Sequence, residues 1–161
     1  MSVRFPTTFR RAVGDDADAI REMVRAAYAK WVPLIGREPR PMVADYGRAV
    51  KEHDIDLLYA ADTLVGLIET KQLPDHLWIE NIAVSPDAQG RGFGKHLLAL
   101  ADEKAARSGC SEIRLLTNEA FAANIALYER SGFSVDRKEP SRLGGVTVFM
   151  SKRLAESSPD H

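Results

Sequence analysis

The segment Gln89–Lys95 carries glycine at three alternate positions, Gly90, Gly92 and Gly94, between an expected strand and an expected helix. Because glycine lacks a Cβ atom, its backbone N–H group can approach a ligand closely. The first turn of a helix also leaves its N–H groups unpaired and carries the positive end of the helix dipole. The segment therefore predicts an anion site, best suited to a phosphate or a diphosphate.

Two common phosphate-binding motifs do not fit this spacing. A P-loop needs a glycine five residues before Gly94 and a serine or threonine after Lys95, but the chain has Gln89 and His96 at these places. A dinucleotide-binding turn needs G-x-G-x-x-G, whereas the chain has G-x-G-x-G. The alternative to an anion site is a glycine-rich surface turn that binds nothing.

The composition is that of an ordinary globular protein. Of the 161 residues, 45% are hydrophobic and 28% are charged. This length predicts a single domain over residues 1–155, followed by a frayed polar tail at 156–161. The net charge of −1 gives no electrostatic case for a nucleic-acid partner or an anionic membrane.

The sequence also bears on where the protein is located and on whether it binds a metal ion. A membrane-spanning helix needs ~20 apolar residues, and the longest apolar runs are far shorter, so we expect no membrane partner. The chain start lacks the apolar core of a signal peptide, and we expect a cytoplasmic protein. The single cysteine, Cys110, excludes an internal disulfide, and the four histidines lack ligand spacing, so we expect no metal site.

The hydrophobic pattern predicts the elements that position the glycine turn. The expected strands are 4–13, 56–61, 64–70, 77–84, 113–118, 133–137 and 146–152, and the expected helices are 14–30, 42–50, 92–107 and 122–131. Asp15 or Asp16 is expected to cap the first helix, and the proline-rich segment Val32–Pro41 is expected to be loop. This mixture of hairpins and crossovers predicts an α/β (α+β) fold with a mixed sheet.

Two motifs resemble the GNAT acetyltransferase superfamily. The first is Gln89–Gly94, which follows Ile82–Val84 and Pro86 and looks like that superfamily's acyl-CoA pyrophosphate loop. The second is Asn124–Phe133, which looks like its asparagine-, alanine- and tyrosine-bearing helix that ends in Gly-Phe. The motifs occur in the right order, and the resemblance is closest over Leu77–Arg137.

The resemblance implies a central mixed sheet, flanked by helices, that splays after the Glu80–Val84 strand and holds acetyl-CoA in the splay. It implies that backbone groups at the end of this strand pair with the pantetheine arm and that the glycine turn holds the diphosphate. It also places Tyr128 at the sulfur and Arg130 at the nucleotide end. The cofactor-binding residues implied in this way are Ile82, Ala83, Val84, Gln89, Gly90, Arg91, Gly92, Phe93, Gly94, Lys95, Asn124, Tyr128 and Arg130.

Acetyl transfer from a thioester to an amine needs a base and a proton for the departing thiolate. Glu80 lies two residues before Ile82, on the same side of an ideal strand, and we expect it to be the general base, directly or through water. Glu69 is the alternative base. We expect Tyr128 to protonate the thiolate, the alternative being a core tyrosine. Cys110 has no assigned base beside it, so we expect direct transfer in a ternary complex.

The acceptor site is expected at the first two helices and their connection, with Tyr28, Trp31, Arg37 and Tyr46 as substrate-binding residues. Aromatic walls suit a cationic amine, and Arg37 or Arg40 suits an acceptor that carries a carboxylate. We expect an N-acetyltransferase that acts on a small-molecule or amino-acid-like amine. A protein N-terminal or lysine acetyltransferase and a non-catalytic acyl-CoA sensor are the alternatives. The oligomeric state is open, a homodimer being one option.

Overall fold

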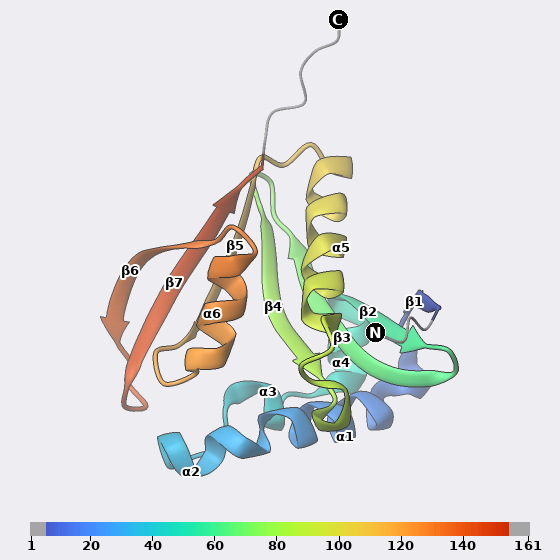
Figure 1. The fold of residues 1–161 in the computed structure, drawn as a ribbon, viewed down its shortest axis with the longest axis horizontal. Coiled ribbons are helices and arrows are strands. Elements are labelled where there is room, and N and C mark those ends of the chain that lie inside the picture. The colour runs from blue at the N-terminus through green and yellow to red at the C-terminus, as the bar shows by residue number, and fades with distance from the viewer. Residues whose placement is uncertain (1–5, 155–161) are drawn as a thin grey trace, which may run out of the picture. The chain divides into compact units, whose positions relative to one another are not determined.

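The computed structural model describes residues 6–154, so the expected tail at 156–161 lies outside the described residues. The strands are β1 (Thr7–Arg11), β2 (Asp54–Ala60), β3 (Thr63–Gln72), β4 (Leu77–Val84), β5 (Glu112–Asn118), β6 (Ser134–Pro140) and β7 (Val146–Arg153). The α-helices are α1 (Ala17–Tyr28), α2 (Val32–Ile35), α3 (Arg40–Val43), α4 (Tyr46–Glu52), α5 (Phe93–Arg107) and α6 (Ala122–Arg130) (Figure 1). Short 3-10 turns lie at Gly14–Asp16, Ala29–Trp31 and Pro86–Ala88.

The strands form one mixed sheet in the order β1-β2-β3-β4-β5-β7-β6. β4 and β5 run parallel, whereas β1 with β2, β2 with β3, β5 with β7 and β6 with β7 run antiparallel. A parallel pair needs a crossover connection, and here that connection contains the glycine turn and α5. The mixed sheet with its helices confirms the predicted fold class.

Contacts within the chain group the described residues into two units. Unit 1 contains residues 6–70 and 81–97, and unit 2 contains residues 71–80 and 98–154. β4 and α5 each contribute residues to both units. The glycine turn therefore belongs to unit 1, and Glu80 and Tyr128 belong to unit 2. The expected single domain stays a prediction.

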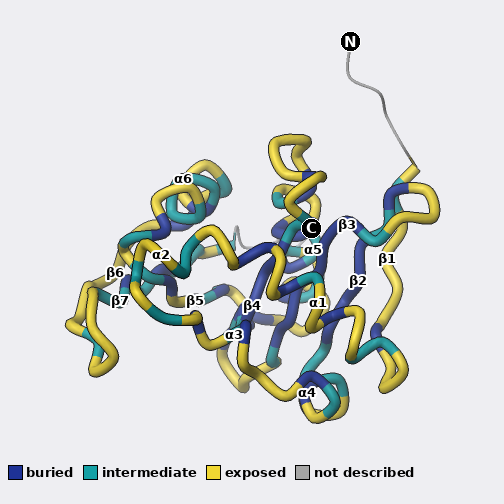
Figure 2. Tube along the Cα trace, turned by 90° about the horizontal axis from the view of Figure 1, so that it is seen from below, coloured by how far each residue is buried: buried dark blue, intermediate teal, exposed yellow. Residues whose placement is uncertain are grey.

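Unit 1 is built around β2 and β3, which are buried along most of their length and drawn dark blue in Figure 2. α1 packs against α3 and α4 and places Ile20 and Val24 in the core. A Cβ atom at Gly66 of β3 would lie 2.9 Å from the carbonyl oxygen of Ala83 in β4. Only glycine therefore allows the two strands to approach as closely as they do here.

Unit 2 is built around β5, β7 and β6. Ile113 and Leu115 of β5 and Val148 and Met150 of β7 are buried, which follows the alternation expected for a strand with one covered face. Figures 1 and 2 show α6 on one face of these strands. An ion pair of 2.9 Å between Lys152 and Asp102 joins β7 to the second part of α5.

The proline-rich segment differs from the expected loop, because α2 and α3 are both helical turns. Pro33 and Pro41 each occupy the second position of their turn. Proline is tolerated there because the first N–H groups of a helix have no intrahelical partner. The expected helix 42–50 is likewise divided, since Asp45 accepts a hydrogen bond from the Arg48 amide at 3.1 Å and starts α4 anew.

The expected cap by Asp16 is found at the 3-10 turn Gly14–Asp16, which leads directly into α1. No side-chain capping bond is found at the start of α1. Instead, Asp16 accepts from the preceding Val13 amide at 2.8 Å and pairs with Arg10 at 2.9 Å. Hydrogen bonding to Arg10 lowers the pKa of the Asp16 carboxyl. The carboxylate therefore caps the amide of Val13, the N-cap residue of this turn, and not an amide of α1 itself.

Candidate functional site

The glycine turn keeps the local structure that the sequence predicts, with β4 before it and α5 after it. Gly90 and Gly92 have φ values of 80° and 87°, in the left-handed region that other residues rarely adopt. A Cβ atom at either position would meet no atom within 4 Å. The backbone conformation, and not a lack of space, therefore requires glycine at both positions.

The backbone amides of residues 90–95 have no hydrogen-bond partner within the part of the chain that the structure describes. The run is bounded by the Gln89 amide, which donates to the Pro86 carbonyl at 3.4 Å, and by the His96 amide, which donates to Gly92 at 3.3 Å. Arg91 and Lys95 are exposed in the same turn. The run combines free donors, cations and the positive end of α5, and such an arrangement can hold a diphosphate.

Gln89 holds the turn through its side chain. Its Nε2 donates to the Val84 carbonyl at 3.1 Å, and its Oε1 accepts from Lys30 Nζ at 2.9 Å. The side chain therefore joins the end of β4 to the segment after α1. Gln89 is one of the residues predicted to contact a cofactor. In the structure, however, both its backbone amide and its side chain are hydrogen-bonded to protein groups.

Two residues predicted to bind substrate, Tyr28 and Tyr46, meet at Asn81 of β4. Tyr28 donates to Asn81 Oδ1 at 2.8 Å and lies 3.2 Å from the Ile82 carbonyl. Asn81 Nδ2 donates to the Tyr46 hydroxyl at 3.2 Å, which itself donates to the Pro41 carbonyl at 2.6 Å. All three side chains are buried. This network ties α1 and α4 to β4.

Sequence reasoning missed Asn81, although a lone amide inside an apolar strand was a signal available for it. The other two residues predicted to bind substrate lie elsewhere in unit 1. Trp31 is partly exposed beneath Lys30, whose Nζ lies 4.9 Å from the centre of the indole. Arg37 follows α2 and makes no hydrogen bond or ion pair with another described residue. The roles of all four stay predictions.

In unit 2, Glu80 is held by a neighbour on its own strand. Its Oε1 accepts from Trp78 Nε1 at 2.8 Å and lies 3.7 Å from Lys71 Nζ. Its Oε2 has no partner among residues 6–154, and the side chain is 29% exposed. The carboxylate is therefore oriented through one oxygen and open through the other, as a base that receives a proton from a ligand must be.

Tyr128 is buried in α6, with its ring centre 5.9 Å from that of Phe133. Burial raises the pKa of Tyr128, so the hydroxyl stays protonated at neutral pH. This hydroxyl makes no hydrogen bond to another described residue. Asn124 lies one helical turn earlier on the same side of α6 and is partly exposed, whereas Arg130 is exposed.

Two further residues considered from sequence have protein partners. Glu69, the alternative base, is buried in unit 1 with Oε2 2.6 Å from His53 Nδ1. Cys110 is buried in unit 2, and its sulfur accepts from Gln72 Nε2 at 2.8 Å. Among residues 6–154, no cluster of three or more His, Cys, Asp or Glu side chains could hold a metal ion. No described helix has the length and apolar character to cross a bilayer.

Relatives with curated descriptions match part of the chain. An N-acetyltransferase of Bacillus subtilis (strain 168), YvbK, is 36% identical over 78 residues. The ribosomal protein bS18-alanine N-acetyltransferase of Salmonella typhimurium (strain LT2) is 41% identical over 78 residues. Each stretch is 48% of this chain and 50% or 52% of the relative. The chain thus spans about half the length of the curated relatives it matches.

Solved structures of similar fold cover nearly the whole chain. The PaiA N-acetyltransferase of Thermoplasma acidophilum, in complex with coenzyme A, has a TM-score of 0.77 at 18% identity and covers 92% of this chain and 99% of its own. The ribosomal-protein-S18-alanine N-acetyltransferase of Escherichia coli has a TM-score of 0.72 at 20% identity and covers 97% and 99%. At such identities the likeness concerns the fold alone.

A protein-family model also matches this chain. The Acetyltransferase (GNAT) family model matches residues 18–133, most of the described chain. The match includes the glycine turn with its unpaired amides, the Trp78–Glu80 pair and the helix that carries Tyr128. The chain therefore belongs to the GNAT family of acetyltransferases.

Proposed function

We propose that the protein transfers the acetyl group of acetyl-CoA to the primary amine of a small-molecule or amino-acid-like acceptor, directly in a ternary complex. The observation that carries this proposal is the run of unpaired backbone amides at residues 90–95. Membership of the family supports acetyl-CoA as the cosubstrate, as does the coenzyme A bound to the PaiA structure. When bound, acetyl-CoA supplies an activated thioester acyl group.

Unit 1 holds the diphosphate and the pantetheine arm of the cosubstrate in this proposal. The amides of residues 90–95 donate to the diphosphate, and Arg91 and Lys95 add charge at the surface. The carbonyls of Ile82 and Val84 each accept one side-chain hydrogen bond, and a carbonyl oxygen has a second lone pair for the pantetheine amides. Ala83 is the residue between them on β4.

Glu80 prepares the acceptor. An alkyl ammonium group has a pKa of about 10 and cannot attack a carbonyl until it loses a proton. Glu80 accepts this proton at Oε2, directly or through water, while Oε1 stays bonded to Trp78. The free amine then attacks the acetyl carbonyl, and the C–N bond forms as the C–S bond breaks. The nitrogen loses its second proton to the departing thiolate, so the products are the amide and the free thiol.

Tyr128 acts on the departing sulfur. Because burial raises its pKa, Tyr128 is a weaker acid than a thiol, whose ordinary pKa is about 8.5. Complete proton transfer from the phenol to the thiolate is therefore uphill. We expect the hydroxyl to donate a hydrogen bond that stabilises the developing thiolate charge, with Asn124 and Arg130 contacting more distant parts of the cosubstrate.

A protein N-terminal amine is the second candidate acceptor. The stretch that is 41% identical to a ribosomal protein bS18-alanine N-acetyltransferase favours it. A non-catalytic acyl-CoA sensor is the third candidate, and the open Oε2 of Glu80 argues against it because a sensor needs no proton acceptor.

Two measurements test the proposal together. Thermal unfolding is followed with acetyl-CoA, ATP or NAD, and release of free thiol is followed with small amines, amino acids and peptides that begin with alanine. We expect only acetyl-CoA to raise the melting temperature, because a ligand of the native state stabilises it. Thiol release with small amines supports the proposal, whereas release with peptides alone favours the protein acceptor. Binding without any amine-dependent release favours the sensor.

A further inference from the structure

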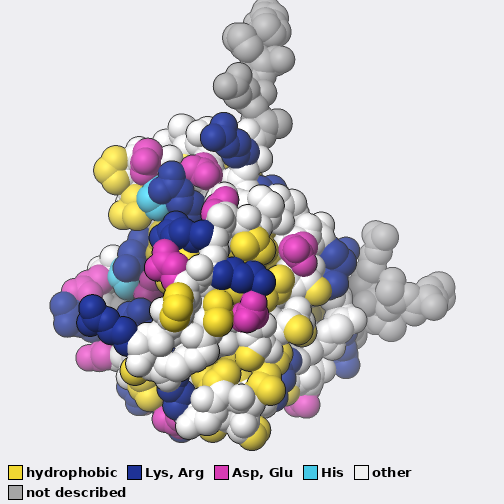
Figure 3. Space-filling model, turned by 90° about the vertical axis from the view of Figure 1, so that its left-hand side faces the viewer, with side chains coloured by type: hydrophobic (Ala, Val, Ile, Leu, Met, Phe, Trp, Pro, Cys, Tyr) yellow, Lys and Arg dark blue, Asp and Glu magenta, His cyan; other side chains and the backbone are white. Residues whose placement is uncertain are grey.

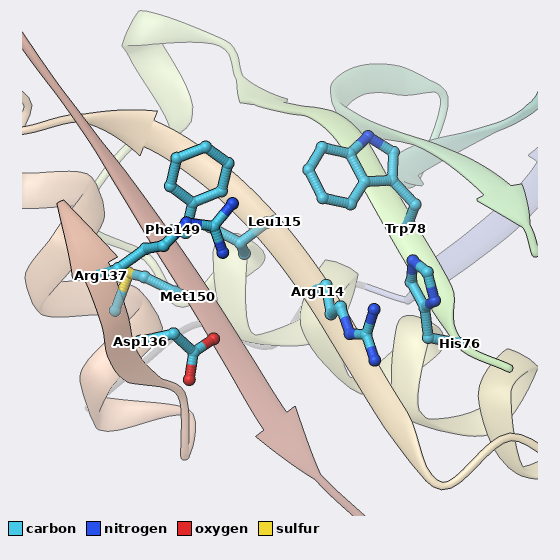
Figure 4. A pocket seen from close by; sticks show the side chains of 8 residues that line it. All are labelled: His76, Trp78, Arg114, Leu115, Asp136, Arg137, Phe149 and Met150. Atoms are coloured by element: carbon cyan, nitrogen blue, oxygen red, sulfur yellow. The ribbon is translucent and has the colours of Figure 1, made fainter. Parts of the chain in front are cut away.

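A cavity of about 180 Å³ lies in unit 2, where β4, β5, β7 and β6 run side by side. In Figure 4, Trp78 and His76 rise from the start of β4 on one side, and Phe149 and Arg137 stand on the other, with Arg114 of β5 between them. The lining residues are His76, Trp78, Arg114, Leu115, Asp136, Arg137, Phe149 and Met150. Sites for drug-sized ligands usually measure about 300–1,000 Å³, so this cavity holds one end of a molecule.

Two arginines give the cavity donors that protein groups do not use. Arg114 binds Glu112 through Nε and Nη2, and its Nη2 lies 4.0 Å from Asp75. Arg137 binds Glu139 through Nε and lies over the Phe149 ring, 3.8 Å from its centre. Within residues 6–154, Nη1 of Arg114 and both Nη atoms of Arg137 have no partner.

The lining contains a single carboxylate, Asp136, which already accepts from the Ser151 hydroxyl at 3.0 Å. His76 is bonded to Asp75 through Nδ1 at 2.7 Å. Each guanidinium is therefore paired with a carboxylate of its own strand, Glu112 or Glu139, and keeps Nη donors available for a ligand. On the side shown in Figure 3, basic and acidic side chains are interleaved with apolar ones. The unused Nη donors suit a carboxylate, which guanidinium groups bind through parallel hydrogen bonds.

Trp78 connects this cavity to the candidate base. Its indole lines the cavity, and its Nε1 donates to Glu80 Oε1. We propose that the cavity binds the carboxylate end of an acceptor whose amine is deprotonated by Glu80. The acceptor is then an amino acid in which an apolar stem separates the two charged groups, and the stem lies against Trp78. This inference rests on the proposed function and names its substrate class. It assigns carboxylate recognition to Arg114 and Arg137, rather than to Arg37 or Arg40.

Two series of acceptors with increasing chain length test whether the cavity binds a carboxylate. Unbranched ω-amino acids are compared with alkylamines of equal carbon number, so that the carboxylate is the difference within each pair. We expect the preferred ω-amino acid to have a KM at least tenfold below that of its alkylamine. Arg114→Gln and Arg137→Gln should each raise this KM by about tenfold, as expected for the loss of one charge-assisted hydrogen bond. The KM values for alkylamines and acetyl-CoA should stay unchanged.

Arg107→Gln is the matched control, because Arg107 is an exposed arginine of unit 2 that pairs with Glu103 and does not line the cavity. It should leave every KM unchanged. Equal KM values for both series in the wild type, or arginine variants that behave like Arg107→Gln, overturn the inference while acetylation of the alkylamines still supports the proposed function.

A binding measurement keeps the inference testable if no amine is acetylated. In a Trp31→Phe background, Trp78 is the remaining tryptophan and reports on the cavity by fluorescence. Straight-chain alkanoates without an amine are titrated into this protein and into its Arg137→Gln derivative. Saturable quenching that weakens about tenfold in the derivative supports the carboxylate site even if the proposed function fails. Absence of quenching, or equal quenching in both proteins, overturns it.

Discussion

The two units of the molecule offer different kinds of chemistry. Unit 1 presents backbone groups, the amides of residues 90–95, which any sequence compatible with the turn would supply. Unit 2 presents side chains, the carboxylate of Glu80 and the hydroxyl of Tyr128, which depend on residue identity. We therefore expect binding of the cosubstrate and turnover to respond to separate substitutions.

The largest effect is expected from Gly92→Glu in unit 1. A carboxylate about 4 Å from a phosphate is repelled by ~4 kcal/mol near a protein surface, which weakens binding roughly 1,000-fold. Calorimetry with acetyl-CoA measures the loss. Gly109→Glu is the control, because Gly109 also has a positive φ, 73°, and open space around a built Cβ atom. Equal losses in the two variants would place the effect in backbone strain and not in the anion site.

Glu80→Gln should lower turnover by about 100-fold, the lower part of the range for general base catalysis. The affinity for acetyl-CoA should stay unchanged. Glutamine can still accept from Trp78, so the side chain keeps its place and only the proton acceptor is lost. Steady-state kinetics and calorimetry measure both quantities, with Glu103→Gln, on the surface of α5, as the control. Full turnover in Glu80→Gln would redirect the search to Glu69 beside His53.

Tyr128→Phe should lower turnover by about tenfold, because it removes one hydrogen bond to a developing charge, worth ~1.5–3 kcal/mol. The affinity for acetyl-CoA should change little. The variant should also lose less stability above pH ~10. The folded pKa of Tyr128 is raised, so wild-type stability is fully present below the unfolded value and falls as pH rises past it. Denaturant unfolding at several pH values checks this, and identical pH curves for both proteins would contradict it.

Asn81→Leu should leave binding and turnover nearly unchanged and act on stability. It removes the hydrogen bonds between Asn81 and the hydroxyls of Tyr28 and Tyr46, each of which contributes about 0.5–1.5 kcal/mol. Urea unfolding measures the loss. Tyr46→Phe alone removes the same hydrogen bond with Asn81, so the double variant should lose less than the sum of the single variants. Strict additivity would show that the network does not act as a unit.

Local rules were sufficient for the elements around the glycine turn. The apolar run followed by Ser85-Pro86 predicted β4 with the bounds that the structure has, and the positive φ values of Gly90 and Gly92 follow from the turn. The first-turn tolerance of proline was overlooked, so the turns at Pro33 and Pro41 were expected as loop. Whether a helix tolerates proline depends on the position of the proline in the helix, because only the first turn leaves its N–H groups unpaired.

The local sequence rules do not predict contacts between residues that are far apart in the chain. Asn81 meets Tyr28 and Tyr46 across 53 and 35 residues of sequence, and no spacing rule predicts such pairs. The Trp78–Glu80 bond was within reach, because residues two apart in a strand share a face. The convergence of Arg114 and Arg137 depended on the strand order, which the sequence left open. Pairing between strands, rather than the strands themselves, limited the prediction of the site.

The close approach at Gly66 has a practical consequence for mutational screens. A single methyl group there would meet the Ala83 carbonyl at 2.9 Å and Leu97 at 3.2 Å and would act as a wedge under the final residues of β4. Such a variant would bind acetyl-CoA poorly although position 66 touches no ligand in the proposed function. A mutant library scored by activity alone would therefore identify Gly66 wrongly as a catalytic residue. A parallel measurement of folding would show that the loss of activity comes from a steric clash.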